Sequence, residues 1–171
     1  MHPSEHAKRT PHKAAYIMAP SGTVVTYAEL NDRSLRGARV LRHWGVNPGE
    51  HIAVFMENNH HYLQIIWAAQ RSGLIVTPIS SHSKVVEVKY ILENSDSKVL
   101  IISAKMHSLA AQLREQAGSV AVFAMVNGAA PGYESWEEAL ARELPEPLGD
   151  ECAGALMMYS DRKSTRLNSS H

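Results

Sequence analysis

The stretch that decides the fold is Leu74-Ile75-Val76-Thr77-Pro78-Ile79. Its apolar character is continuous rather than alternating, which is typical of a strand buried on both faces, as in a parallel sheet. We expect Pro78 near the strand's end, where its missing N–H costs least. The stretch therefore predicts one of the inner strands of a parallel β-sheet.

The segments on either side of this strand alternate between strand and helix patterns. Gly73 ends the helix before it, and Asn58 or Asn59 can cap that helix. Alternation of this kind predicts βαβ units, and hence an α/β fold with a mainly parallel sheet flanked by helices. The expected strands are 51–56, 74–79, 98–102 and 120–126, and the expected helices are 61–72, 84–94 and 106–116.

The N-terminal part predicts a hairpin followed by a long helix. Residues 14–18 and 23–25 form the two arms of the hairpin, and Thr26 and Glu29 have capping-box spacing. We expect the helix to run to about Trp44, with an apolar stripe toward the core. Its arginines could bind phosphate, but the stronger expectation is that they form a solvated face.

The C-terminal part predicts one more helix and one more strand. Ser135 repeats the capping-box spacing and starts a helix to about Leu144, and residues 145–150 form an extended linker. The apolar run Gly154-Ala155-Leu156-Met157-Met158-Tyr159-Ser160 then predicts a buried strand that brings a loop to the sheet edge. Ligands of α/β proteins bind at the carboxyl ends of such strands.

Composition narrows the class of protein. The 171 residues include 17 basic and 17 acidic side chains, so a nucleic acid or an anionic membrane is not the expected partner. The single cysteine, Cys152, excludes an internal disulfide framework and favours a reducing compartment, and we expect it to be buried. The N-terminus lacks a signal-peptide pattern, and no apolar run could span a bilayer. We expect a cytoplasmic protein without a transmembrane segment.

Local motifs identify no catalytic or metal-binding residue. The Gly-rich dinucleotide and Walker patterns are absent, as is the hydrolase elbow. His60 and His61 lack the i, i+4 spacing of a helical metal site. Glu57-Asn58-Asn59 and Ser80-Ser81-His82 each follow an expected strand, where helix capping competes with ligand binding as the explanation. One hypothesis is therefore a free-standing α/β small-molecule-binding module without catalysis, with Asn58, Asn59 and His82 lining its cleft.

The order of several segments resembles the adenylate-forming, AMP-binding enzymes, and within that family the acyl-CoA synthetases. Each segment is weak alone, but together they cover about residues 7 to 160. The segments that carry the resemblance are Arg9-Thr10-Pro11-His12-Lys13-Ala14-Ala15, Thr26-Tyr27-Ala28-Glu29-Leu30, residues 41–54, Glu57-Asn58-Asn59, Trp67-Ala68-Ala69-Gln70-Arg71-Ser72-Gly73, Tyr90-Ile91-Leu92 and Lys98-Val99-Leu100.

The resemblance implies a ligase with two half-reactions. ATP, with Mg²⁺ offsetting its charge, activates a small-molecule carboxylic acid as an acyl-adenylate, and the thiol of CoA then displaces AMP. In such proteins a segment like residues 155–160 leads into a Ser/Thr/Gly phosphate-binding loop ending in Pro-Lys. Ser160 matches the first position of that loop, and Asp161 onward does not match it.

The resemblance also predicts the domain organisation. Residues 1–160 would be an incomplete N-terminal subdomain of an AMP-binding synthetase domain. Residues 161–171 resemble the translation of a common sequencing-library adapter, so we expect a non-native tail. The adenine and acyl pockets and the C-terminal lysine domain of the family would lie beyond residue 160. We therefore expect this N-terminal fragment to be inactive and to bind ATP, Mg²⁺ and CoA poorly.

Overall fold

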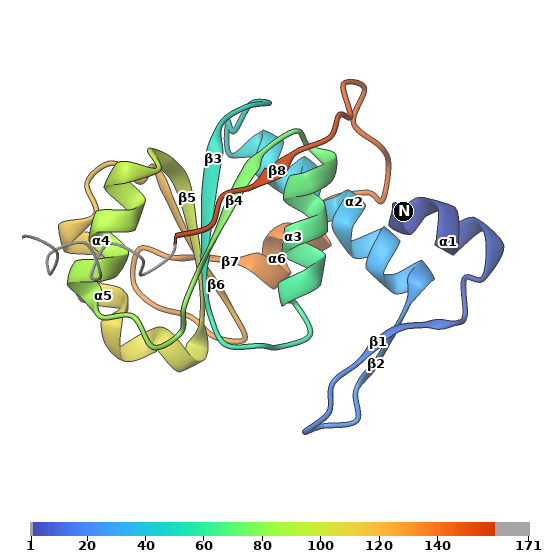
Figure 1. The fold of residues 1–171 in the computed structure, drawn as a ribbon, viewed down its shortest axis with the longest axis horizontal. Coiled ribbons are helices and arrows are strands. Elements are labelled where there is room, and N and C mark those ends of the chain that lie inside the picture. The colour runs from blue at the N-terminus through green and yellow to red at the C-terminus, as the bar shows by residue number, and fades with distance from the viewer. Residues whose placement is uncertain (1, 160–171) are drawn as a thin grey trace, which may run out of the picture.

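A six-stranded parallel β-sheet forms the centre of the molecule (Figure 1). The computed structural model describes residues 2–159. The strand order is β7-β6-β5-β3-β4-β8, and every neighbouring pair is parallel. The strands are His51–Phe55 (β3), Ile75–Ile79 (β4), Ser97–Ser103 (β5), Val122–Val126 (β6), Glu134–Ser135 (β7) and Ala155–Leu156 (β8). The predicted α/β fold with a mainly parallel sheet is confirmed.

Helices cover both faces of the sheet. One face packs against Tyr27–His43 (α2), Tyr62–Arg71 (α3) and Trp136–Ala141 (α6). The other face packs against Val85–Asn94 (α4) and His107–Gln116 (α5), which follows a short 3₁₀ turn, Ala104–Met106. Each face has its own apolar core, because side chains along a strand alternate between the two sides.

Strand β3 lies between β4 and β5 and contributes to both cores. Ile52 and Val54 point into the core under α2 and α3, while Ala53 and Phe55 point into the core under α4 and α5. None of these four side chains is exposed. Burying one large aliphatic or aromatic side chain stabilises a fold by about 1.5–3 kcal/mol, so apolar contacts alone can hold this strand in place.

The N-terminal elements pack beside the sheet rather than within it. They are a short helix, Pro3–Arg9 (α1), and an antiparallel hairpin of Ala14–Ile17 (β1) and Val24–Thr26 (β2). The predicted capping box is present at the start of α2. The Glu29 N–H donates to Thr26 Oγ1 at 3.3 Å, and the Thr26 N–H donates to Glu29 Oε2 at 2.8 Å.

Three boundaries differ from the sequence predictions. Helix α1 was not predicted, although Pro3 in its first turn and the His2 side chain accepting from the Ser4 N–H are ordinary start signals. Strand β7 is only two residues long and has no pattern of its own. Helix α6 ends at Ala141 rather than Leu144, because the chain turns there and buries Glu143 against α2.

The prediction of a buried strand over residues 154–160 was wrong for its described part, residues 154–159. Strand β8 comprises Ala155–Leu156, and Leu156 is 56% exposed. It lies at the sheet edge and pairs with β4 on one side only, so neither core reaches its side chains. Cys152, expected to be buried, is also exposed, because it lies just before this edge strand.

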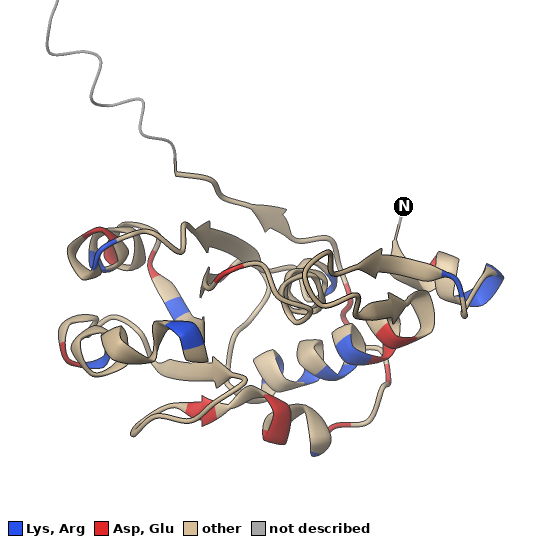
Figure 2. Cartoon of the chain, turned by 90° about the horizontal axis from the view of Figure 1, so that it is seen from below, with Lys and Arg blue, Asp and Glu red and all other residues tan. Residues whose placement is uncertain are grey.

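The expected solvated arginine face of α2 is also corrected. Figure 2 shows basic and acidic residues distributed along the whole cartoon of the chain. Arg36 pairs with Asp32 at 2.9 Å, Arg39 with Glu143 at 3.2 Å, and Arg42 with Asp150 at 2.5 Å. Arg36, Arg39 and Arg42 therefore pair with α2 itself and with the segment that leads to β8.

Helices α2 and α3 approach closely at Gly37. A Cβ atom added there would lie 2.8 Å from Ala68 Cβ and 3.1 Å from Trp136 Cζ2. Real Cβ atoms do not approach a neighbouring carbon this closely, so a side chain at this position would push α2 away from α3 and α6.

We predict that Gly37→Ala destabilises the chain by about 1–3 kcal/mol, despite the higher helix propensity of alanine, because the core is overpacked. The measurement is urea unfolding followed by circular dichroism. Gly118→Ala is the matched control, since a Cβ at Gly118 meets nothing within 4 Å. Equal unfolding free energies for the two variants would contradict the close approach.

Candidate functional site

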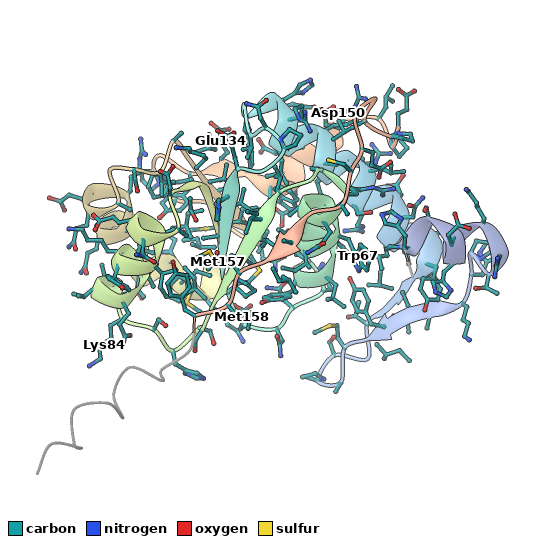
Figure 3. All side chains as sticks on the ribbon, turned by 45° about the horizontal axis from the view of Figure 1, so that its top comes forward. Trp67, Lys84, Glu134, Asp150, Met157 and Met158 are labelled. Carbon is teal, nitrogen blue, oxygen red and sulfur yellow. The ribbon has the colours of Figure 1, made fainter. Side chains whose placement is uncertain are left out.

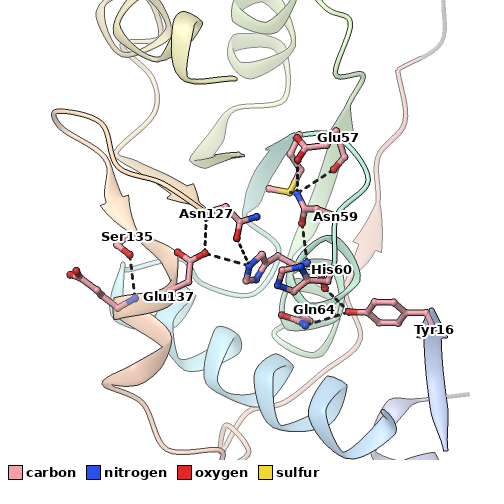
Figure 4. Close-up of polar contacts among 11 residues, drawn as sticks. Tyr16, Glu57, Asn59, His60, Gln64, Asn127, Ser135 and Glu137 are labelled. Carbon is pink, nitrogen blue, oxygen red and sulfur yellow. Dashed lines mark hydrogen bonds and ion pairs between the residues drawn. The ribbon is translucent and has the colours of Figure 1, made fainter. Parts of the chain in front are cut away.

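Polar side chains meet at the carboxyl ends of β3, β5 and β6. In the strand order, the chain passes from β3 to β4 on one side and then to β5 on the other, which makes the β3–β5 boundary a topological switch point. Ligands of open α/β sheets bind outside the carboxyl ends of strands at such points. We name these side chains the carboxyl-edge cluster: Glu57, Asn59, His61, Ser103, Asn127 and Glu137. Figure 4 labels four of them, Glu57, Asn59, Asn127 and Glu137.

Glu57 and Ser103 join the ends of β3 and β5. The Ser103 hydroxyl, at the last residue of β5, donates a short hydrogen bond to Glu57 Oε2. Burial acts to raise the pKa of Glu57, but hydrogen bonds from Ser103, the backbone and Asn59 outweigh it and leave the pKa below its usual value. Glu57 is therefore a carboxylate held in its ionised form.

Asn59 shapes the turn between β3 and α3. Its Oδ1 accepts from the His61 N–H at 2.9 Å, and its amide donates to Glu57 Oε1 at 3.3 Å. The prediction that Asn58 or Asn59 caps α3 was wrong: the N-cap is His61, no side chain caps the helix, and Asn59 instead stabilises the turn before it. The side chain of Asn58, by contrast, is exposed.

His61 is the buried member of the cluster, with 3% of its surface exposed. Its Nε2 lies 3.1 Å from Asn127 Oδ1 and 3.4 Å from Glu137 Oε1, and its Nδ1 is buried without a hydrogen-bond partner. Burial, with a contribution from the neighbouring imidazole of His60, lowers the pKa of His61. A neutral imidazole with the proton on Nε2 satisfies both acceptors, so His61 acts as a donor between α3 and the β6–α6 region.

Tyr16 ties the N-terminal hairpin to the start of α3. Its hydroxyl donates to the His60 carbonyl at 2.5 Å and accepts from Gln64 Nε2 at 3.3 Å. Burial raises the pKa of this phenol. Like His61 Nδ1, Gln64 Oε1 is buried without a partner, so the first turn of α3 carries two unpaired acceptors.

Several of these residues were not predicted from the sequence. Ser103, Asn127 and Glu137 were not singled out, and His61 was considered only as a metal ligand. For two of them, the sequence does contain a signal: Ser103 ends a buried strand, and Asn127 directly follows one. Asn127 has a left-handed conformation with φ of 58°. Within residues 2–159, no group of three or more His, Cys, Asp or Glu side chains could hold a metal ion.

The remaining predicted residues lie apart from the cluster. His82 is exposed, and its N–H donates to Ser80 Oγ at 3.3 Å. Two shallow hollows lie beside α1, both lined by Arg71 and Glu151, and Asn58, Asn59 and His82 line neither of them. Ser160, the predicted start of a phosphate loop, lies outside the described residues, as do residues 161–171. No helix of the described part is long and apolar enough to cross a membrane.

Strand β8 leads toward the same edge of the sheet as the cluster. Because β8 runs parallel to β4, the chain after Leu156 continues alongside residues 77–79. The Met157 N–H donates to the Val76 carbonyl at 3.0 Å, and the Tyr159 hydroxyl donates to Asn94 Oδ1 at 2.7 Å. Residues 157–159 thus run toward the carboxyl edge of the sheet.

Comparison with known proteins identifies the family. The model of the family described as "AMP-binding enzyme" matches residues 3–160. The chain belongs to the AMP-binding enzymes. More particularly, it resembles the N-terminal domain of acyl-CoA ligases.

The sequence identities to two relatives show how similar the chain is to these ligases. A long-chain-fatty-acid–CoA ligase of Mycobacterium tuberculosis is 28% identical over 153 residues, which are 88% of this chain and 29% of the relative. A feruloyl-CoA synthase of Amycolatopsis is 35% identical over 99 residues, 58% of this chain and 20% of the relative. The chain thus spans less than a third of the length of these relatives.

Solved structures agree with the sequence relatives. A fatty acyl-CoA synthetase of Mycobacterium tuberculosis superposes with a TM-score of 0.81 at 26% identity, over 94% of this chain and 32% of that one. An inhibitor-bound N-terminal domain from the same organism gives a TM-score of 0.83 at 25% identity, over 96% of this chain and 41% of that one. Both structures share the fold over nearly the whole of the described chain.

We predict that the unfolding free energy falls as the pH decreases from about 6.5 toward 5. The unfolded chain binds a proton at the ordinary histidine pKa of about 6.5, whereas the folded pKa of His61 is lower. The unfolded state therefore binds more protons in this window, and the stability present above it is lost on acidification. Urea unfolding at several pH values measures the slope.

His61→Gln should flatten this slope, by at most about 1.4 kcal/mol per pH unit for one proton. Part of the slope remains, because burial also lowers the pKa of His2 and His60. His12→Gln, which removes an exposed imidazole away from the cluster, is the matched control. Identical slopes in the parent chain and His61→Gln would show that His61 does not resist protonation.

Proposed function

We propose that the chain is the N-terminal part of an ATP-dependent acyl-CoA ligase. In the complete protein, a carboxylate attacks the α-phosphate of ATP, forming an acyl-adenylate and releasing pyrophosphate. The thiol of CoA then attacks the acyl carbon, and AMP leaves as the thioester forms. The protein would work in the cytoplasm.

The observation that carries this proposal is the course of the chain at β8. The family match extends to residue 160, and β8 leads the chain out at the carboxyl edge of the sheet, beside β4. A loop of glycines and hydroxyl residues placed there could surround phosphates with backbone N–H groups. We propose Ser160 as the first residue of that loop.

The described residues do not by themselves fit ATP. The carboxyl-edge cluster carries the carboxylates of Glu57 and Glu137, whose negative charge repels a triphosphate. Most of its hydrogen-bond donors already have acceptors inside the cluster. Phosphate binding needs donors and cations that lie beyond Tyr159. In the complete protein, Mg²⁺ would neutralise part of the phosphate charge. We derive no catalytic step from residues 2–159.

We propose a carboxylic acid as the second substrate. The names of the two relatives, a long-chain-fatty-acid–CoA ligase and a feruloyl-CoA synthase, share a carboxylic acid joined to CoA but differ in the acyl group. The shared chemistry is the carboxylate. Residues 1–160 would be the incomplete N-terminal subdomain of the synthetase, and residues 161–171 would be foreign to it.

We predict that the 171-residue chain releases no pyrophosphate from ATP, whether or not an acid is present. A chain extended with the genomic sequence that follows the codon for Ser160 should release pyrophosphate only when ATP and a carboxylic acid are both present. A coupled pyrophosphate assay over a panel of fatty and aromatic acids makes the comparison.

The outcomes separate the parts of the proposal. Thioester formation by the 171-residue chain alone would contradict its inactivity. An extended chain that releases no pyrophosphate with any acid would contradict the ligase function. A genomic sequence after Ser160 that encodes no Gly-rich and Thr-rich loop would contradict the position of the phosphate loop.

A further inference from the structure

Strand β8 has little apolar contact to fix its position. Figure 3 shows Met157 and Met158 at the open side of the sheet, and Met158 is 71% exposed. The strand joins β4 through the Ala155 N–H, which donates to the Leu74 carbonyl at 3.0 Å, and through the Met157 N–H, which donates to the Val76 carbonyl at 3.0 Å. Such a short edge ladder could fray or slip.

The segment before β8 is held by ion pairs instead. Arg39 Nε lies 3.2 Å from Glu143 Oε2, and His43 Nδ1 lies 2.5 Å from Glu143 Oε1. Farther along, Arg42 pairs with Asp150 at 2.5 Å. Asp150 lies at the opposite end of the segment from Met157 (Figure 3). Basic side chains of α2 therefore lie along the segment from Glu143 to Asp150.

Arg71 of α3 differs from these surface cations because its side chain is only 3% exposed. Its Nε donates a short hydrogen bond to Glu151 Oε1. Its Nη1 donates to Ser34 Oγ at 2.7 Å and to Asn31 Oδ1 at 3.2 Å, both on α2. One guanidinium thus joins α2, α3 and the residue four positions before β8. Its fork geometry fixes direction as well as distance.

The residues beside Arg71 contact the residues that follow Glu151. Ser72 forms an isolated parallel bridge with Cys152, and the Gln70 carbonyl accepts from the Gly154 N–H at 2.6 Å. At Gly154, an added Cβ atom would lie 2.3 Å from the Leu74 carbonyl oxygen. Residues 70–74 therefore contact residues 151–155 at several successive positions. The Arg71–Glu151 pair is the first of these contacts along the segment that leads to β8.

We propose that Arg71 is a positioning residue: its buried guanidinium, paired with the partly exposed carboxylate of Glu151, fixes the register of β8 on β4. This proposal rests on the proposed function in one respect, namely that the chain after β8 would then carry the phosphate loop to a fixed place. The Arg42–Asp150 pair does not share the role. Asp150 is 56% exposed, so solvent and salt screen that pair.

Hydrogen exchange of the 171-residue chain, resolved by mass spectrometry, tests the proposal. Glu151→Gln should raise the exchange rates of the Ala155 and Met157 amides at least tenfold while the amides of β3 and β5 change less than twofold. Arg71→Lys, which keeps the charge but loses the fork, should raise them by an intermediate factor. Asp150→Asn is the matched control and should change them less than twofold.

Four results would overturn the role of Arg71. The first is unchanged exchange of β8 in Glu151→Gln, and the second is equal acceleration in β3 and β5, which would assign the pair to the whole fold. The third is an Asp150→Asn effect as large as that of Glu151→Gln. The fourth is a parent chain in which the Ala155 and Met157 amides already exchange at unstructured rates.

The extended chain separates this proposal from the proposed function. There, Glu151→Gln should raise the KM for ATP at least fivefold and leave the KM for the acid within twofold, because only the phosphate loop moves. An extended chain without ligase activity would remove the proposed function, while the exchange of the β8 amides would still decide the role of Arg71. Equal changes in both KM values would contradict a specific effect on the nucleotide side.

Discussion

The fold depends on the complete burial of residues 52–55 of β3 between two strands and two helical layers. Its side chains alternate between two separate cores, so both layers of helices need this strand in one register. A shift by one residue would exchange the two sets of side chains, and Ala53 and Phe55 would no longer match the spaces under α4 and α5. The carboxyl-edge cluster inherits its geometry from this register, because Glu57 and Asn59 follow β3 directly.

The polar residues at the carboxyl edge form a connected network rather than an open cleft. Hydrogen bonds run from Ser103 through Glu57 and Asn59 to the start of α3, and from His61 to Asn127. A buried polar network is stabilising when its members are satisfied, and costly where an acceptor stays unpaired. In this chain, the polar residues at the switch point hydrogen-bond the strand ends to one another. The proposed nucleotide chemistry lies at the neighbouring β4–β8 edge.

Sequence patterns predicted the interior of the fold well and its edges poorly. The continuous apolarity of residues 74–79 and the capping box at Thr26 are local patterns whose meaning does not depend on which other segment packs nearby. Both predictions are confirmed. The exposure of β8 depends instead on which strands flank it, and that information is not local. Similarly, Glu143 ends α6 early because of α2, which is about a hundred residues away in the sequence. The pairing of His61 with Asn127 also joins elements whose proximity only the topology creates.

The pairing of Ile75 with Ala155 has a consequence for the order in which the sheet is made during synthesis. The partners are 80 residues apart (155 − 75), whereas β3, β4, β5 and β6 all lie between residues 51 and 126. Closing a longer loop costs more conformational entropy, and a chain leaves the ribosome from its N-terminus. The central strands can therefore assemble while β8 is still inside the ribosome, and the outer side of β4 stays open until β8 arrives. During that interval, a chaperone or a neighbouring nascent chain could occupy the place that β8 takes later.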